Sequence, residues 1–106
     1  MAQILAVVSD LMLASRVKES LTAAGHEVSV IATLPDPAEA DAIVCDLDTA
    51  DADEIAATDI PSLGFYSHLD VDTRTRAQQA GLDQIVPRSR MSRELPTLVD
   101  KLLSEA

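Results

Sequence analysis

The sequence predicts an α/β fold in which five parallel strands form a doubly wound sheet with helices on both faces. Short apolar runs without alternation, such as Ile4 to Val8, are typical of strands that are covered on both sides. Helical periodicity separates these runs, and parallel strands need such crossover connections between them. With 106 residues, the chain is expected to form a single domain over residues 1–106.

The first half of the chain predicts three strands, at residues 4–8, 28–32 and 42–45. Apolar residues at helical spacing indicate a helix after the first strand, namely Ala14, Val17, Leu21 and Ala24. Ser9 or Asp10 is the expected N-cap of this helix, and Gly25 is its expected C-terminal stop. The turn-rich segment 34–37 leaves room for only one or two helical turns before Asp41. The second helix is therefore expected to be short.

The second half predicts two more strands and three helices. A shortened third helix at about 51–57 precedes a fourth strand, 60–66, with Pro61 at its start, where a missing amide donor is tolerated. The fourth helix is marked by a face of Thr73, Ala77 and Ala80. The fifth strand, 85–86, is very short. The last helix has a clear apolar stripe of Leu95, Leu98, Val99 and Leu102, and Pro96 is expected in its first turn.

Charge and composition exclude several classes of protein. Eighteen acidic against eight basic residues give a net charge of -10, which would repel a nucleic acid and an anionic membrane alike. The single Cys45 excludes an internal disulfide. No stretch approaches the roughly 20 apolar residues of a membrane span, and the N-terminal apolar run lacks a basic leader. We therefore expect a cytoplasmic protein, as a monomer or weak homodimer, without nucleic-acid or membrane partners.

Polar side chains follow the predicted strands at the points where they end. They are Ser9 and Asp10 after the first strand, Asp46 and Asp48 after the third, Tyr66, Ser67 and His68 after the fourth, and Arg88 after the fifth. The carboxyl ends of parallel strands meet at one edge of a sheet, which is where functional groups gather in such folds. His68 has no second His or Cys near it and is expected to be a loop residue without a zinc site.

The segment from Asp41 to Asp48, with the sequence DAIVCDLD, is the most specific part of a wider resemblance. Over essentially the whole chain, the sequence resembles the CheY-like receiver domains of two-component signalling, which have a flavodoxin-like fold. The resemblance implies that Asp46 takes the phosphoacceptor position. It also implies that Asp48 takes the place whose main-chain carbonyl helps to hold Mg²⁺, and that Arg88 stands at the family's lysine position.

Other positions depart from the family pattern. The switch hydroxyl falls on Tyr66, with Ser67 one place late, and the two acids that end the family's first strand fall on either Val8 and Ser9 or Ser9 and Asp10. Three carboxylates are weak candidates for holding Mg²⁺, namely Asp46, Asp48 and Asp10. The departures predict an atypical receiver, or pseudo-receiver, in which any phosphorylation of Asp46 is slow and depends weakly on Mg²⁺. Arg88 is expected to pair with Asp46 as a counter-ion.

Two classes of function remain open at this point. The first is a stand-alone response-regulator module for signal transduction, which is no enzyme and acts by contact with a signalling protein or histidine kinase. The second is a small flavodoxin-like ligand-binding domain or enzyme that uses the same strand ends. The chain lacks a Gly-rich phosphate loop, because its three glycines, Gly25, Gly64 and Gly81, are scattered. This absence favours the first class.

Overall fold

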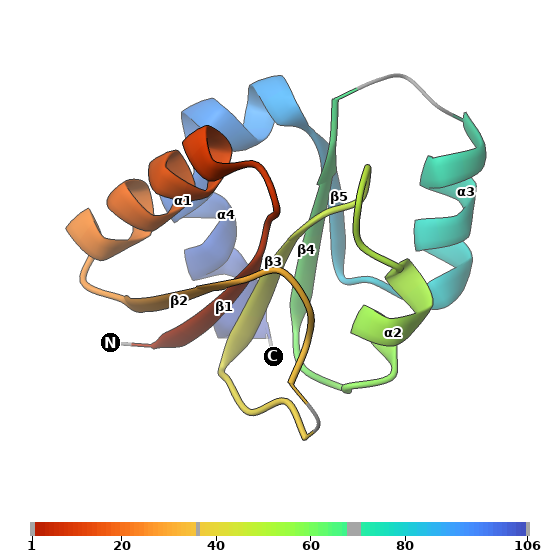
Figure 1. Ribbon diagram of the computed structural model, residues 1–106, viewed down its shortest axis with the longest axis horizontal. Coiled ribbons are helices and arrows are strands. Elements are labelled where there is room, and N and C mark those ends of the chain that lie inside the picture. The colour runs from red at the N-terminus through yellow and green to blue at the C-terminus, as the bar shows by residue number, and fades with distance from the viewer. Residues whose placement is uncertain (1, 36, 68–70, 106) are drawn as a thin grey trace.

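The computed structural model describes residues 2–35, 37–67 and 71–105, and His68 lies outside them. The strands are β1 (Gln3–Val7), β2 (Glu27–Ile31), β3 (Ala42–Asp46), β4 (Ser62–Tyr66) and β5 (Gln84–Pro87). The helices are α1 (Leu11–Ala23), α2 (Ala52–Ala56), α3 (Val71–Ala80) and α4 (Arg88–Glu105). All strand pairs are parallel, in the order β2-β1-β3-β4-β5 (Figure 1). The predicted doubly wound α/β fold is confirmed.

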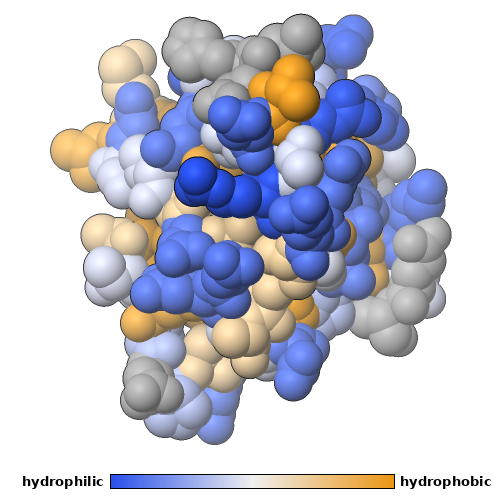
Figure 2. Space-filling model, turned by 90° about the vertical axis from the view of Figure 1, so that its right-hand side faces the viewer, coloured by the Kyte–Doolittle hydropathy of each residue, from blue (hydrophilic) through white to orange (hydrophobic). Residues whose placement is uncertain are grey.

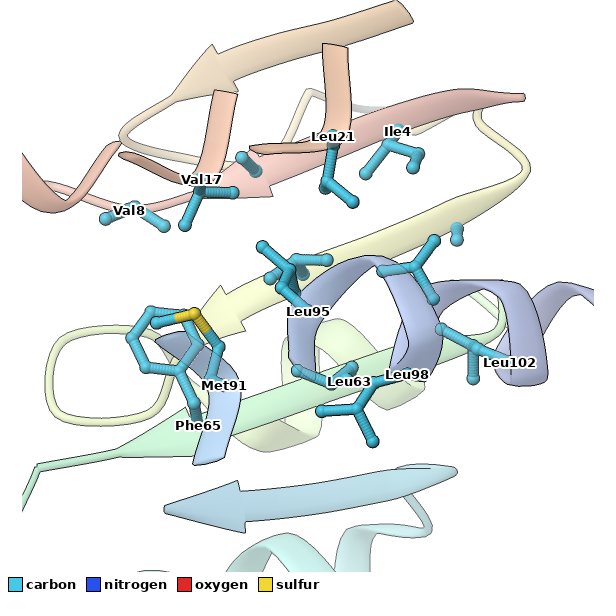
Figure 3. Packing of buried hydrophobic residues seen from close by; sticks show 14 of the residues in the cluster. Ile4, Val8, Val17, Leu21, Leu63, Phe65, Met91, Leu95, Leu98 and Leu102 are labelled. Carbon is cyan, nitrogen blue, oxygen red and sulfur yellow. The ribbon is translucent and has the colours of Figure 1, made fainter. Parts of the chain in front are cut away.

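The sheet separates two apolar layers. Side chains alternate between the faces along β1, where Ile4 and Ala6 join one buried cluster and Leu5 and Val7 join the other. Helices α1 and α4 cover the first face, and α2 and α3 cover the second (Figure 1). Figure 3 shows the layer beneath α1 and α4, in which Phe65 of β4 lies beside Met91 of α4. Outside this core, the side of the molecule with α2 and α3 is largely hydrophilic (Figure 2).

Helix α1 begins and ends as the sequence predicts. Of the two candidate caps, Asp10 is the N-cap, and its Oδ1 accepts a hydrogen bond from the Leu13 amide at 3.0 Å. Gly25 follows the helix with φ at +95°, a left-handed conformation that only glycine adopts without strain. The cap directs α1 back over the sheet, and the buried face of the helix then packs on β1 and β2.

Two predictions about helices are wrong. No helix occurs between β2 and β3 within residues 32–35 and 37–41, since Pro35 and Pro37 interrupt this short connection. The described part of the chain thus has one helix fewer than expected, while α2 is short as predicted. Pro96 was expected in the first turn of the last helix but lies in the interior of α4. The helix begins at Arg88, directly after the last residue of β5, and Met91 extends the apolar stripe toward this start. No helix in the described residues is long and apolar enough to cross a membrane.

The loop between α2 and β4 contains a strained residue. Asp59 has φ at +59°, in the left-handed region that disfavours residues with a Cβ atom. We expect Asp59→Gly to raise the free energy of unfolding by roughly 0.5–1 kcal/mol, because glycine adopts this conformation without the steric cost. Urea unfolding measures the change. Asp59→Ala is the matched control, since it also removes the carboxylate but keeps the Cβ, and equal stabilisation by both variants would contradict the explanation.

Candidate functional site

The strand register brings four chain segments together at the carboxyl edge of the sheet. Asp46 of β3 pairs with Phe65 of β4, and Phe65 pairs with Val86 of β5. On the other side, Val7 of β1 pairs with Cys45, the residue before Asp46. The residues that follow these strands therefore lie at one edge of the sheet. They are Ser9 and Asp10, Leu47 and Asp48, Ser67, and Arg88.

Asp46 is the central polar residue of this edge. It is the last residue of β3, and only 6% of its surface is exposed. Its Oδ1 accepts a hydrogen bond from the Asp48 amide at 2.9 Å, and its main-chain carbonyl accepts from the amides of Thr49 and Ala50. These bonds form a tight turn that fixes the direction of the carboxylate. Its second oxygen, Oδ2, accepts no hydrogen bond from the described residues.

Burial raises the pKa of the Asp46 carboxyl group, because removal from water disfavours the charged form. The hydrogen bond from the Asp48 amide acts against this effect and lowers the pKa. The nearby carboxylates of Asp48 and Asp10 raise the pKa, and the Arg88 guanidinium lowers it. The pKa of Asp46 is raised overall. Keeping Asp46 ionised in the folded protein therefore costs folding free energy.

Asp48 connects β3 to the end of β4. Its Oδ2 accepts hydrogen bonds from both the amide, at 3.1 Å, and the Oγ hydroxyl of Ser67. No sequence pattern pointed to this bridge, although both residues follow neighbouring parallel strands at matching positions. Tyr66 and Ser67, the two candidates for the switch hydroxyl, lie in different surroundings. Tyr66 is buried in the cluster beneath α2 and α3, while Ser67 is exposed at the edge.

The described carboxylates at this edge do not form a cluster of three that could hold Mg²⁺. Such an ion takes oxygen ligands in near-octahedral geometry. The Asp10 carboxylate caps α1, and one oxygen of Asp48 is held by Ser67. Among the described residues, no group of three His, Cys, Asp or Glu side chains is arranged to hold a metal ion. Val8, one alternative for a family acid, is a buried core residue.

Arg88 is not the direct partner of Asp46 that the sequence predicts. Both residues lie in the described part of the chain, and no ion pair or hydrogen bond joins them. The reason is that Arg88 is the first residue of α4, where its side chain is exposed to solvent. It acts on Asp46 only as a more distant positive charge.

Solved structures with the same fold identify the architecture. A receiver domain protein (CheY-like) from Methanospirillum hungatei JF-1 is similar with a TM-score of 0.86 and 17% identity, over 99% of this chain and 95% of that one. The receiver domain of the Francisella response regulator 1452 is similar with a TM-score of 0.80 and 15% identity, over 99% of this chain and 98% of that one. NtrX from Brucella abortus, solved in complex with ADP, is similar with a TM-score of 0.78 and 20% identity. The match covers 98% of this chain and 26% of that one.

No family model matches the sequence, and no curated protein does so either. The structural similarity, at low identity, establishes the fold. The chain has the flavodoxin-like architecture of CheY-like response-regulator receiver domains, as the sequence predicted.

Proposed function

We propose that this chain is an atypical receiver module of signal transduction, folding as one domain over residues 1–106, with Asp46 as its phosphoryl acceptor. The observation that carries the proposal is the position of the Asp46 carboxylate. It ends the central strand β3 at the carboxyl edge, with Oδ1 held by the Asp48 amide and Oδ2 without a partner among the described residues. One oxygen fixes the geometry, and the other is left to react.

The chemistry assigned to Asp46 is nucleophilic attack on a phosphodonor. Oδ2 attacks the phosphorus atom of an acyl or histidyl phosphate, an O–P bond forms, and the donor's bond to phosphorus breaks with its electron pair leaving on the donor. The carboxylate must be ionised to attack. Arg88, which acts on Asp46 as a more distant positive charge, and the Ser67 hydroxyl after the neighbouring strand β4 are assigned the stabilisation of the added charge.

Three features of the edge make this reaction slow. Burial disfavours the ionised nucleophile, the carboxylates of Asp10 and Asp48 add negative charge, and Arg88 is not in contact with Asp46. Each feature opposes the approach of an anionic phosphodonor. Because the Asp10 carboxylate caps α1 and one oxygen of Asp48 is held by Ser67, the rate is expected to depend weakly on Mg²⁺.

A signalling protein, such as a histidine kinase, is the proposed partner. The first turn of α1 follows Asp10 directly and exposes two large apolar side chains, Leu11 at 84% and Met12 at 76%. Isolated apolar side chains next to a reactive edge suit a protein contact better than a nucleic acid, which the net charge of -10 repels. In this proposal the chain acts by binding and carries no enzymatic turnover of its own.

Incubation with acetyl phosphate, followed by intact-mass measurement, tests the proposed function. We expect slow addition of one phosphoryl group to the wild-type chain, with little change when Mg²⁺ is removed. Asp46→Asn should abolish the addition, since an amide is a poor nucleophile. Asp53→Asn is the matched control, because this exposed carboxylate on α2 belongs to no part of the site. Absence of addition to the wild type, or its persistence in Asp46→Asn, would refute the assignment.

A further inference from the structure

β2 is an edge strand whose outer side is open among the described residues. It lies at one end of the sheet, next to β1 (Figure 1). The Glu27 amide donates to the Ala2 carbonyl at 2.9 Å, and the Ile31 carbonyl accepts from the amide that follows β1 at 3.2 Å. Since main-chain groups alternate in direction along a strand, those of Val28 and Val30 point away from β1. No other described strand pairs with them.

β2 lacks the features that keep an edge strand from pairing with another chain. Protected edges carry a lysine, a proline or a bulge. The sequence of β2, EVSVI, contains neither residue, and its register with β1 runs without a bulge. Its valines and isoleucine favour extended backbone, and 39% of the Val30 surface is exposed. The strand at the other edge, β5, ends in Pro87, which has no amide hydrogen to donate. β2 is therefore the edge that can accept a further strand.

The outer side of β2 is complementary to itself. When two copies pair in antiparallel fashion about a two-fold axis at Ser29, Val28 of each copy lies opposite Val30 of the other. The outward main-chain groups of these residues then exchange both N–H···O bonds, and the valine side chains cover one another. Val28 already packs against the cluster beneath α1 and α4, so this apolar layer continues across the pair. Glu27, the one charged residue of β2, lies opposite Ile31, and no like charges face each other between the strands.

We propose that β2 is a self-association surface through which two copies of this chain form a two-fold symmetric dimer with one continuous sheet. Main-chain hydrogen bonds supply the affinity in such strand addition. A strand of five residues offers only a small contact, and the net charge of -10 on each copy opposes its formation. The dimer is therefore weak, and salt strengthens it by screening the repulsion. Association through β2 requires no chemistry at Asp46.

Sedimentation velocity over a concentration series up to about 1 mM tests the dimer. We expect Val30→Lys to raise the dissociation constant of the wild-type dimer at least roughly tenfold, because it sets a hydrated ammonium group opposite Val28. Val71→Lys is the matched control, since it changes the net charge equally at a position on α3 that is 69% exposed. A wild type that stays monomeric throughout would leave the edge to a strand of another protein and refute self-association. Equal association of the two lysine variants, or a wild-type dimer that salt weakens, would also refute it.

Cross-linking through Ser29→Cys tests the register independently. The two copies of this position face each other across the axis as a non-hydrogen-bonded pair, with about 4.5 Å between Cα atoms, which a disulfide can span. Mild oxidation should therefore give a covalent dimer.

Glu27→Cys is the control for this experiment. Glu27 is also exposed and lies on the same face of β2, but in the proposed register its two copies are several residues apart along the strands. Cys45 does not interfere, because burial raises its pKa to about 12 and keeps the thiol protonated. Equal cross-linking of Ser29→Cys and Glu27→Cys, or none in Ser29→Cys, would refute the proposed pairing.

Discussion

Replacing Gly64 with alanine is expected to lower the free energy of unfolding by about 1–3 kcal/mol. A Cβ atom at Gly64 would lie 2.7 Å from Leu47 Cδ1 and 2.8 Å from Leu47 Cγ, closer than real Cβ contacts. Leu47 is 7% exposed and packed in the cluster beneath α2 and α3, so its side chain cannot turn away into solvent. Urea unfolding measures the loss.

The same substitution should disturb the candidate site. Leu47 directly follows Asp46, and its displacement would move the turn that orients the Asp46 carboxylate. Tyr66 fluorescence reports this change, since Tyr66 lies in the same cluster as Leu47. Gly25→Ala is the control. Gly25 has φ at +95° with open space around its Cβ position, so alanine there costs stability through the backbone alone.

A double variant separates the clash from other causes. Leu47→Ala removes the atoms that Gly64→Ala would meet, so the losses from the two substitutions should be less than additive. Strict additivity, or an equal tyrosine response in Gly25→Ala, would contradict the steric explanation.

Asp46→Asn is expected to raise the free energy of unfolding at pH 7 by about 1 kcal/mol. The variant removes a buried charge, and the Asn oxygen can still accept from the Asp48 amide. Burial raises the pKa of Asp46. At pH values between the ordinary pKa and the raised one, the folded state therefore binds more protons than the unfolded state. Wild-type stability therefore falls as the pH rises through this window and stays reduced above it.

Urea unfolding of both proteins at several values between about pH 4 and pH 8 tests this expectation. The advantage of Asp46→Asn should grow through the window and then level off. Asp53→Asn, which removes an exposed carboxylate, should show no such growth. A constant difference between wild type and Asp46→Asn at every pH would show that burial of the charge is not the cause.

Much of the fold was predictable because it depends on local patterns. Continuous apolar runs such as residues 42–45 mark buried parallel strands, and the alternation with helices determines the sheet. The position of Asp46 at the carboxyl edge follows from the end of its strand. The start of α4 was missed because Arg88 carries no capping signal and no acidic residue stands in the first turn.

The contacts within the site were less predictable. The sequence places Asp48, Ser67 and Arg88 at the same edge, but side-chain directions decide which of them meet. Asp48 meets Ser67, and Arg88 is carried outward on the first turn of α4. Which side chains contact one another depends on their rotamers and on competing hydrogen-bond donors, and the spacing of residues in the sequence does not encode either.

The direct junction of β5 and α4 has a mechanical consequence. Pro87 ends the strand and Arg88 begins the helix, so no linker residue separates them. The 18 residues of α4, with Pro96 in the interior, make an arm about 27 Å long that runs from the carboxyl edge to the opposite end of the molecule (Figure 1). A tilt of about 5° at this hinge-free joint would displace the distal end of the arm by about 2 Å. A displacement of the end of β5 would thus be passed directly to the far end of α4.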